Sequence, residues 1–233
     1  MSKSFRQLKY LRPAGATELL LVRHGESAPA VEGTSFPLVD GQGDPPLSPD
    51  GREQAARVAT RLMVSSVDAA YATSLQRTVE TAAPFVERSG LPLAIEPELR
   101  EVFLGEWEGG AFRQRVIERD PVAVRMLEEQ RWDVIPGAEP AAEFGARVRA
   151  GVLRVASLHP DQRVAVFTHG GVIGCVLALA TGCQPFAFTN ADNGSITHVV
   201  VSGAGPSAPW TVRRFNDTAH LEPGFTVLSA PLT

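Results

Sequence analysis

The stretch Glu18-Leu-Leu-Leu-Val-Arg-His-Gly-Glu-Ser27 decides the fold. Its first half is an apolar run of the length of a short strand, and its second half begins with Arg23-His24-Gly25. An uninterrupted apolar run that ends in a polar, glycine-containing turn is typical of a strand covered on both faces. Ligands of open α/β sheets bind outside the carboxyl ends of such strands, so Arg23 and His24 become the first candidate site residues.

A second segment, late in the chain, repeats this arrangement. Val164-Ala-Val-Phe167 runs into Thr168-His169-Gly170-Gly171, and an apolar helix is expected from about Gly171. The N-terminal amides of that helix would point toward the strand end, where the helix dipole favours an anion. The sequence therefore predicts two histidines and an anion-binding helix terminus at one edge of a sheet.

Strand and helix patterns alternate through the rest of the chain. Ser48 can cap a helix that has Pro49 at its first position. The expected strands are 18–22, 67–72, 163–167, 195–201 and 210–215, and the expected helices are 49–64, 75–89 and one that begins near 171. This alternation predicts an α/β fold, a three-layer sandwich with a mostly parallel central sheet and helices on both faces.

The chain divides into a tail and one domain. Pro13-Ala-Gly15 interrupts any pattern before the first apolar run, so residues 1–16 are expected to form an N-terminal tail. A single domain is expected over 17–233, because a chain of this length can bury one hydrophobic core. Two polar, Arg-rich helical stretches at 111–131 and 139–158 predict a small helical lid within 102–160.

Composition excludes several classes of partner. The 233 residues include 22 Lys and Arg against 26 Asp and Glu, a net charge of −4 without a basic block. This balance argues against a nucleic-acid or membrane-surface partner and leaves the oligomeric state open. The longest apolar run, 170–182, is too short to span a bilayer, and no apolar signal segment precedes Glu18, so a cytoplasmic location is expected. The spacing of Cys175 and Cys183 matches neither a redox pair nor a zinc motif, and no metal site is expected.

Two further residues, Arg77 and Glu101, complete a site for a phosphoryl group. Arg77 follows the strand 67–72 near a helix start, and with Arg23 it offers two planar guanidinium forks for phosphate oxygens. A histidine nucleophile, a second imidazole and two arginines would serve phosphoryl transfer. Glu101 could protonate the leaving oxygen and then activate water, although the nearby Glu106 and Glu108 leave a solvated acidic turn as the alternative.

These segments together resemble the histidine phosphatase superfamily, the family that includes cofactor-dependent phosphoglycerate mutase. The resemblance covers almost the whole chain and rests on segments in family order: Arg23-His24-Gly25-Glu26-Ser27, Pro46-Leu47-Ser48, Ser74 with Arg77-Thr78, Leu99 with Glu101, Pro136-Gly137 with Glu139, and His169-Gly170. It implies that His24 is the phosphorylated nucleophile, that Arg23, Arg77 and His169 bind the phosphate, and that Glu101 donates and accepts the proton. It also implies a catalytic contribution from His169 and no metal or cofactor.

The chain departs from the family pattern in the loop after the nucleophile. The family often has an asparagine six residues after the nucleophile, where this chain has Ala30. Ser27 and the helix start at Gly170 are expected to add phosphate contacts. The arginines of the first lid stretch are interpreted as a solvated helix face, and they are Arg113, Arg115, Arg119, Arg125 and Arg131.

The leading hypothesis is a phosphomonoester hydrolase that acts on a small phosphorylated substrate. The alternatives are a phosphoglycerate-type mutase and a non-catalytic protein that binds a phospho-ligand. The mutases of the family resemble one another in a long basic insertion after the Glu101 segment, whereas about two dozen residues separate Gly110 from Pro136 here. This short segment favours hydrolysis.

Overall fold

A six-stranded mixed sheet forms the centre of the protein in the computed structural model, which describes residues 5–203, 205 and 207–221. The strand order is β5-β4-β6-β1-β7-β8. The strands are β1 (Thr17–Arg23), β4 (Ala69–Ala72), β5 (Leu93–Ile95), β6 (Arg163–Thr168), β7 (Ile196–Val201) and β8 (Trp210–Asp217). The ladders among β5, β4, β6 and β1 are parallel, and β7 is antiparallel to both of its neighbours. The expected mostly parallel sheet is confirmed.

Strand β1 is buried on both faces, as its apolar run predicts. Leu19 and Leu21 pack into one hydrophobic cluster, and the alternate residues Leu20 and Val22 pack into another. Successive side chains of a strand point to opposite faces, so the two clusters lie on opposite sides of the sheet. The expected three-layer sandwich is therefore confirmed.

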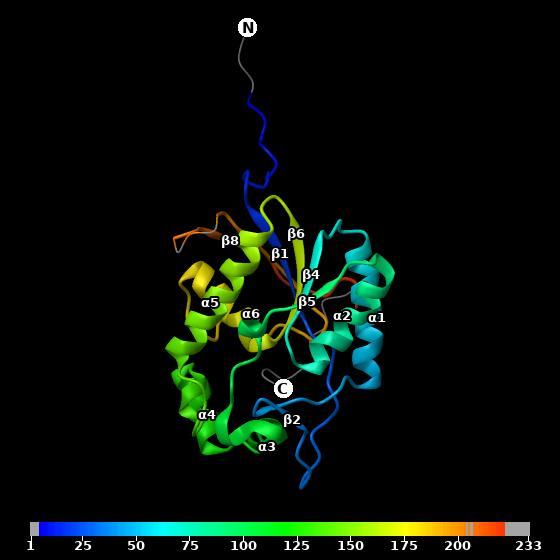
Figure 1. Cartoon of the computed structure of the whole chain (residues 1–233). Coiled ribbons are helices and arrows are strands. Elements are labelled where there is room, and N and C mark those ends of the chain that lie inside the picture. Colours follow the sequence, from blue (N-terminus) through cyan, green and yellow to red (C-terminus); the bar gives the residue numbers. More distant parts are fainter. Residues whose placement is uncertain (1–4, 204, 206, 222–233) are drawn as a thin grey trace.

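Helices cover both faces. Figure 1 shows α1 (Pro49–Met63) and α2 (Gln76–Ser89) on one side of the sheet, and α5 (Ala141–Leu158) and α6 (Gly170–Thr181) on the other. The predicted cap of α1 is present, because the Ser48 side chain accepts a hydrogen bond from the Gly51 amide and Pro49 is the first helical residue.

The segment 105–134, at the carboxyl ends of the strands, includes the stretch 111–131 that is expected to be helical. It contains the 3₁₀ segment η2 (Gly105–Gly110), α3 (Ala111–Ile117), α4 (Pro121–Glu129) and η3 (Trp132–Val134). The helical pattern breaks because Pro121 lacks an amide hydrogen and begins a new helix, which Asp120 caps through the Val122 amide at 2.8 Å. The stretch 111–131 is helical as expected, and Pro121 divides it.

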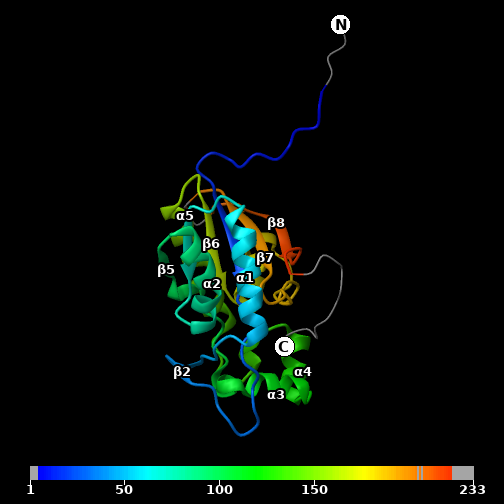
Figure 2. The ribbon, with the colours of Figure 1, turned by 90° about the vertical axis from the view of Figure 1, so that its right-hand side faces the viewer.

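Two small elements escaped the sequence pattern. They are the edge strand β5 and the hairpin of β2 (Leu38–Val39) and β3 (Gln42–Gly43), each only two or three residues long. Figures 1 and 2 place β2, α3 and α4 together at the end of the molecule opposite the N-terminal tail. This is the end at which β1 and β6 finish. In the described part of the chain no helix is long and apolar enough to cross a membrane.

Candidate active site

His24 and His169 lie side by side because their strands are neighbours. Arg23 at the end of β1 pairs with Thr168 at the end of β6, and the next residue along each strand is a histidine. The two imidazole centroids are 5.2 Å apart, and the rings meet edge to face. Both side chains are buried. The parallel register of two strands thus brings together residues that are 145 positions apart, since 169 − 24 = 145.

The contacts of His24 select one tautomer. Nε of Arg77 donates a hydrogen bond to Nε2 of His24 at 3.3 Å, so Nε2 carries a lone pair. Nδ1 therefore carries the proton and donates a hydrogen bond to the carbonyl oxygen of Gly25 at 2.7 Å. An unprotonated Nε2 is the form of imidazole that attacks an electrophile.

The surroundings keep both histidines neutral. Burial, and next the positive charges of Arg77 and Arg23, hold the pKa of His24 well below its ordinary value of 6.5. Burial also holds the pKa of His169 well below 6.5, with Arg77 as the second cause. Desolvation disfavours the charged imidazolium, and a nearby cation disfavours it further. His24 therefore needs no general base to become a nucleophile at neutral pH.

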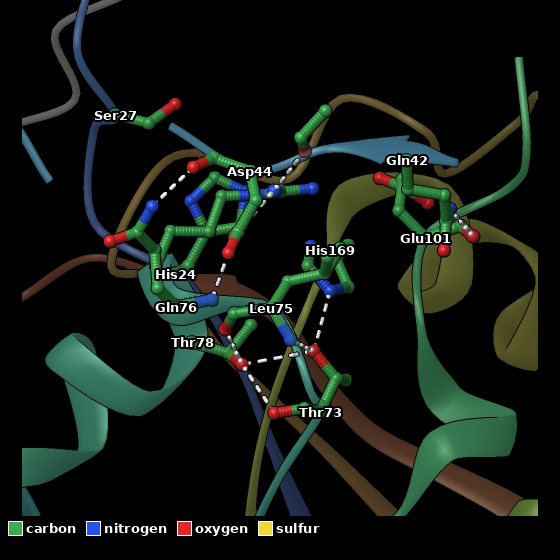
Figure 3. A network of polar contacts seen from close by, with 12 residues as sticks. His24, Ser27, Gln42, Asp44, Thr73, Leu75, Gln76, Thr78, Glu101 and His169 are labelled. Atoms are coloured by element: carbon green, nitrogen blue, oxygen red, sulfur yellow. Dashed lines mark hydrogen bonds and ion pairs between the residues drawn. The ribbon is translucent and has the colours of Figure 1, made fainter. Parts of the chain in front are cut away.

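Arg77 is oriented from a distant part of the chain. Its NH1 donates to the carbonyl oxygen of Gly43 at 2.9 Å and lies 3.9 Å from the carboxylate of Asp44. Asp44 also accepts the Gln76 amide at 2.8 Å and so caps α2, whose own N-cap residue, Leu75, offers no side-chain hydrogen bond. Figure 3 shows Asp44 above the start of this helix. Burial lowers the pKa of Arg77 to about 10, which leaves the guanidinium charged at neutral pH.

His169 is held by a pair of threonines. Its Nε2 lies 3.0 Å from Oγ1 of Thr73, which is 2.9 Å from Oγ1 of Thr78 (Figure 3). Its Nδ1 is buried, and in the described part of the chain it has no hydrogen-bond partner. A buried polar atom without a partner costs free energy, so a ligand that offers it a hydrogen bond would bind favourably here.

Of the three candidate acids, Glu101 reaches the helix start beside His169. Its carboxylate accepts a hydrogen bond from the backbone amide of Gly171 at 3.1 Å and another from the backbone amide of Val102, the next residue, at 3.0 Å. A Cβ at position 171 would lie 2.5 Å from Oε1 of Glu101, so only glycine permits this approach. Glu108 is occupied by the amides of Gly43 and Leu104, and Glu106 is exposed.

The remaining predicted residues lie at the same edge. Arg23 donates to the carbonyl oxygen of Ala191, and a Cβ at Gly170 would lie 3.4 Å from Nε of Arg23. Ser27 is buried, and its hydroxyl accepts a hydrogen bond from Arg113 at 2.6 Å. The structure therefore brings together Arg23, His24, Ser27, Arg77, Glu101, His169 and Gly170.

Sequence reasoning missed two residues that contact this constellation. Arg113 does not belong to a solvated helix face, because its guanidinium is half-buried and bonded to Ser27 and to the Ala28 carbonyl. Asn193 donates from Nδ2 to the carbonyl oxygen of His24 at 2.9 Å. No local pattern marks Asn193, since the contact depends on how the chain returns before β7. Within the described ranges no three His, Cys, Asp or Glu residues cluster in a way that could hold a metal ion.

Comparison with known proteins identifies the family of this chain. The family model described as the histidine phosphatase superfamily (branch 1) matches residues 19–218. The chain is 32% identical over 209 residues to "Phosphoglycerate mutase-like protein 4" of Arabidopsis thaliana, covering 88% of this chain and 87% of that protein. It is 28% identical over 208 residues to "Probable phosphoglycerate mutase GpmB" of Yersinia enterocolitica, covering 88% and 95%.

A solved structure extends the similarity to a phosphatase. The mycobacterial glucosyl-3-phosphoglycerate phosphatase in complex with inorganic phosphate superposes with a TM-score of 0.71 at 25% identity, covering 88% of this chain and 99% of that one. Because the family model spans most of the sequence and the fold agrees, this chain belongs to the histidine phosphatase superfamily.

Proposed function

We propose that this protein is a phosphomonoester hydrolase that acts on a small phosphorylated substrate through a phosphohistidine on His24. The observation that carries the proposal is the unprotonated, buried Nε2 of His24 in contact with Arg77. A neutral nucleophile between two guanidinium groups suits attack on a phosphoryl group, since the cations neutralise the charge that builds up on its oxygens. Arg23 and Arg77 supply this charge from the protein, so the reaction needs no metal or other cofactor.

In the first step Nε2 of His24 attacks phosphorus and the bond from phosphorus to the leaving oxygen breaks. Arg23, Arg77 and His169 bind the phosphoryl oxygens, with further contacts from the Ser27 hydroxyl and the Gly170 amide. Protonated Glu101 gives its proton to the leaving oxygen, which departs as an alcohol. The products of this step are the alcohol, phosphohistidine and an ionised Glu101.

In the second step the carboxylate of Glu101 takes a proton from water as the water oxygen attacks phosphorus. The bond from phosphorus to Nε2 breaks, and its electron pair returns to the imidazole. Inorganic phosphate leaves, and Glu101 is protonated again for the next cycle. The location of the reaction in the cytoplasm stays a prediction from the sequence.

A phosphoglycerate-type mutase is the second candidate, because the named relatives from Yersinia enterocolitica and Arabidopsis thaliana are called phosphoglycerate mutase or mutase-like. A mutase must keep water away from the phosphohistidine until the rearranged product recovers the phosphoryl group. Incubation with 3-phosphoglycerate, with and without 2,3-bisphosphoglycerate, separates the two. Release of free phosphate in excess of 2-phosphoglycerate supports hydrolysis, and faster bisphosphate-dependent interconversion supports the mutase.

The intermediate itself can be trapped. Wild type quenched in alkali during turnover of a labelled phosphoester is expected to carry base-stable, acid-labile phosphate on His24. The His24→Ala variant should lose both the label and the turnover, and excess chelator should change neither in wild type. His159→Ala serves as the control, because this histidine bonds to Tyr71 and Gln162 away from the site. Activity of His24→Ala close to that of wild type would refute the proposal and would assign the nucleophile to another residue.

A further inference from the structure

Arg113 links α3 to the loop that follows the nucleophile. Its NH2 donates to the Ser27 hydroxyl at 2.6 Å and its NH1 donates to the Ala28 carbonyl at 2.8 Å. The guanidinium also lies over the ring of Phe36, 5.5 Å from the centroid. Two hydrogen bonds, at the consecutive residues Ser27 and Ala28, and a ring contact at Phe36 hold this side chain in one place, unlike a solvated arginine.

The charge of Arg113 lacks the carboxylate partner that three other arginines of this region have. Arg115 lies 2.6 Å from Asp120, Arg125 lies 3.5 Å from Glu129, and Arg131 lies 2.7 Å from Asp133. No carboxylate lies within 4.0 Å of Arg113 among the residues that the structure describes. Burial lowers the pKa of Arg113, and Glu26 is the residue whose charge opposes this shift. A partly buried guanidinium without an anion is costly unless a ligand supplies the anion.

The positive charge of Arg113 reaches the phosphoryl site. It contributes to the lowered pKa of His24, of Arg23 and of Arg77. Three guanidinium groups around one neutral imidazole repel one another. A dianion that binds among them attracts all three, and this attraction offsets their mutual repulsion. The cluster thus has the electrostatics of a site that is completed by its ligand.

Two small residues let this part of the molecule come close to the loop. Gly110 has a φ of 110°, and a Cβ added to it would lie 3.1 Å from the Phe36 ring and 3.2 Å from the Cβ of Ala30. A larger side chain at either position would push α3 away from the loop. Ala30 stands where the family often has an asparagine, and its short side chain leaves room for the close approach of Gly110.

We propose that Arg113 is a substrate-binding residue, the third guanidinium of the phosphoryl site, contributed by the segment after Glu101. This inference rests on the proposed function. Ser27 and Ala28 take two of its five N–H donors, and the phosphoryl group takes one or more of the others. The affinity for the substrate's phosphoryl group then depends on α3 as well as on the residues at the strand ends.

The test compares Arg113→Gln and Arg113→Lys with wild type and with Arg115→Gln, a control on the same helix whose arginine pairs with Asp120 at the surface. The measurements are kcat and KM for p-nitrophenyl phosphate and the inhibition constant of inorganic phosphate. Arg113→Gln should raise the inhibition constant about tenfold or more, the loss of one charge-assisted hydrogen bond. Arg113→Lys should recover part of the affinity, and Arg115→Gln should stay within about twofold of wild type.

Phe36→Leu separates binding from a merely structural role, because it removes the ring over which Arg113 lies and keeps the charge. We expect Phe36→Leu to weaken phosphate binding less than Arg113→Gln does. Equal losses in both variants, with no further loss in the double variant, would overturn the inference, as would an unchanged inhibition constant in Arg113→Gln. Melting temperatures without phosphate identify unfolded variants, and in that case Arg113→Lys carries the comparison. A wild type that neither hydrolyses phosphoesters nor binds phosphate would instead refute the proposed function.

Discussion

The two ring nitrogens of His24 have different partners, and the difference defines its chemistry. Nδ1 donates to the Gly25 carbonyl, and Nε2 accepts from Arg77. The carbonyl belongs to the next residue in the chain, so the local turn fixes the tautomer before any substrate binds. Burial acts in the same direction, because it lowers the pKa of His24 and so disfavours the imidazolium, in which Nε2 is protonated. One glycine turn and one arginine therefore make an ordinary imidazole nucleophilic at neutral pH.

The proposed role of Glu101 leads to a prediction at the scale of single residues. Glu101→Gln should slow hydrolysis of an alkyl phosphate far more than that of p-nitrophenyl phosphate, because a poor leaving group needs the proton and an activated phenol does not. Steady-state rates on both substrates measure this contrast. Glu106→Gln, which changes an exposed carboxylate five residues away, should leave both rates near wild type. Equal losses on the two substrates in Glu101→Gln would assign the acid role elsewhere.

At the scale of elements, the site depends on segments that contribute no reacting group. The loop 191–194 holds the end of β1 through the Gly194 amide, which donates to the Arg23 carbonyl at 3.0 Å. The same loop is held in turn from the C-terminal side, where the ring of His220 lies 3.0 Å from the Gly194 carbonyl and Asn216 bonds to Asp192. The position of His24 is thus set both from its own strand and from β8 with the segment that follows it.

Substitution of Asn193 tests whether the loop 191–194 positions His24. Asn193→Ala removes the hydrogen bond to the His24 carbonyl and should lower kcat/KM by about fivefold to tenfold, since such a bond contributes about 1 kcal/mol. Asn193→Asp also lacks the donor and should not restore the rate. Gln130→Ala is the control, because its amide bonds to Gln184 at an exposed position. Full activity in Asn193→Ala, with an unchanged melting temperature, would show that β1 alone positions His24.

At the scale of the whole molecule, the buried neutral histidines make stability depend on pH. The pKa values of His24 and His169 are lowered on folding, so below about pH 6.5 the unfolded chain binds protons that the folded chain does not. Their contribution to stability is fully present above that pH and is lost as the pH falls. Each should reduce the free energy of unfolding by about 1.4 kcal/mol per pH unit in the acid range.

Urea unfolding of wild type and His24→Asn at pH 7, 6 and 5 measures this dependence. The variant lacks one of the titrating groups, so its stability should fall less steeply with acid, whatever its stability at pH 7. The difference between the two curves isolates His24 from the carboxylates that titrate in the same range. Parallel curves for the two proteins would show that His24 is protonated in the folded state.

The sequence by itself determined five of the six strands of the sheet, its two covered faces and the residues at the strand ends. It did so because these features are local. An apolar run specifies a buried strand, and the polar residue after the run must lie at the carboxyl end of that strand. His24 and His169 could be predicted for this reason, and the histidine phosphatase resemblance could be read from the same segments. Their roles in catalysis stay a prediction.

Only the tertiary structure decided the contacts between distant loops. Arg113 is 86 residues from Ser27, and Asp44 caps a helix that begins 32 residues later. Helical periodicity places Arg113 on a polar stripe in either environment, and it does not say whether water or a loop covers that stripe. The answer depends on the break at Pro121 and on the small residues Ala30 and Gly110, whose joint effect appears only when the chain is folded.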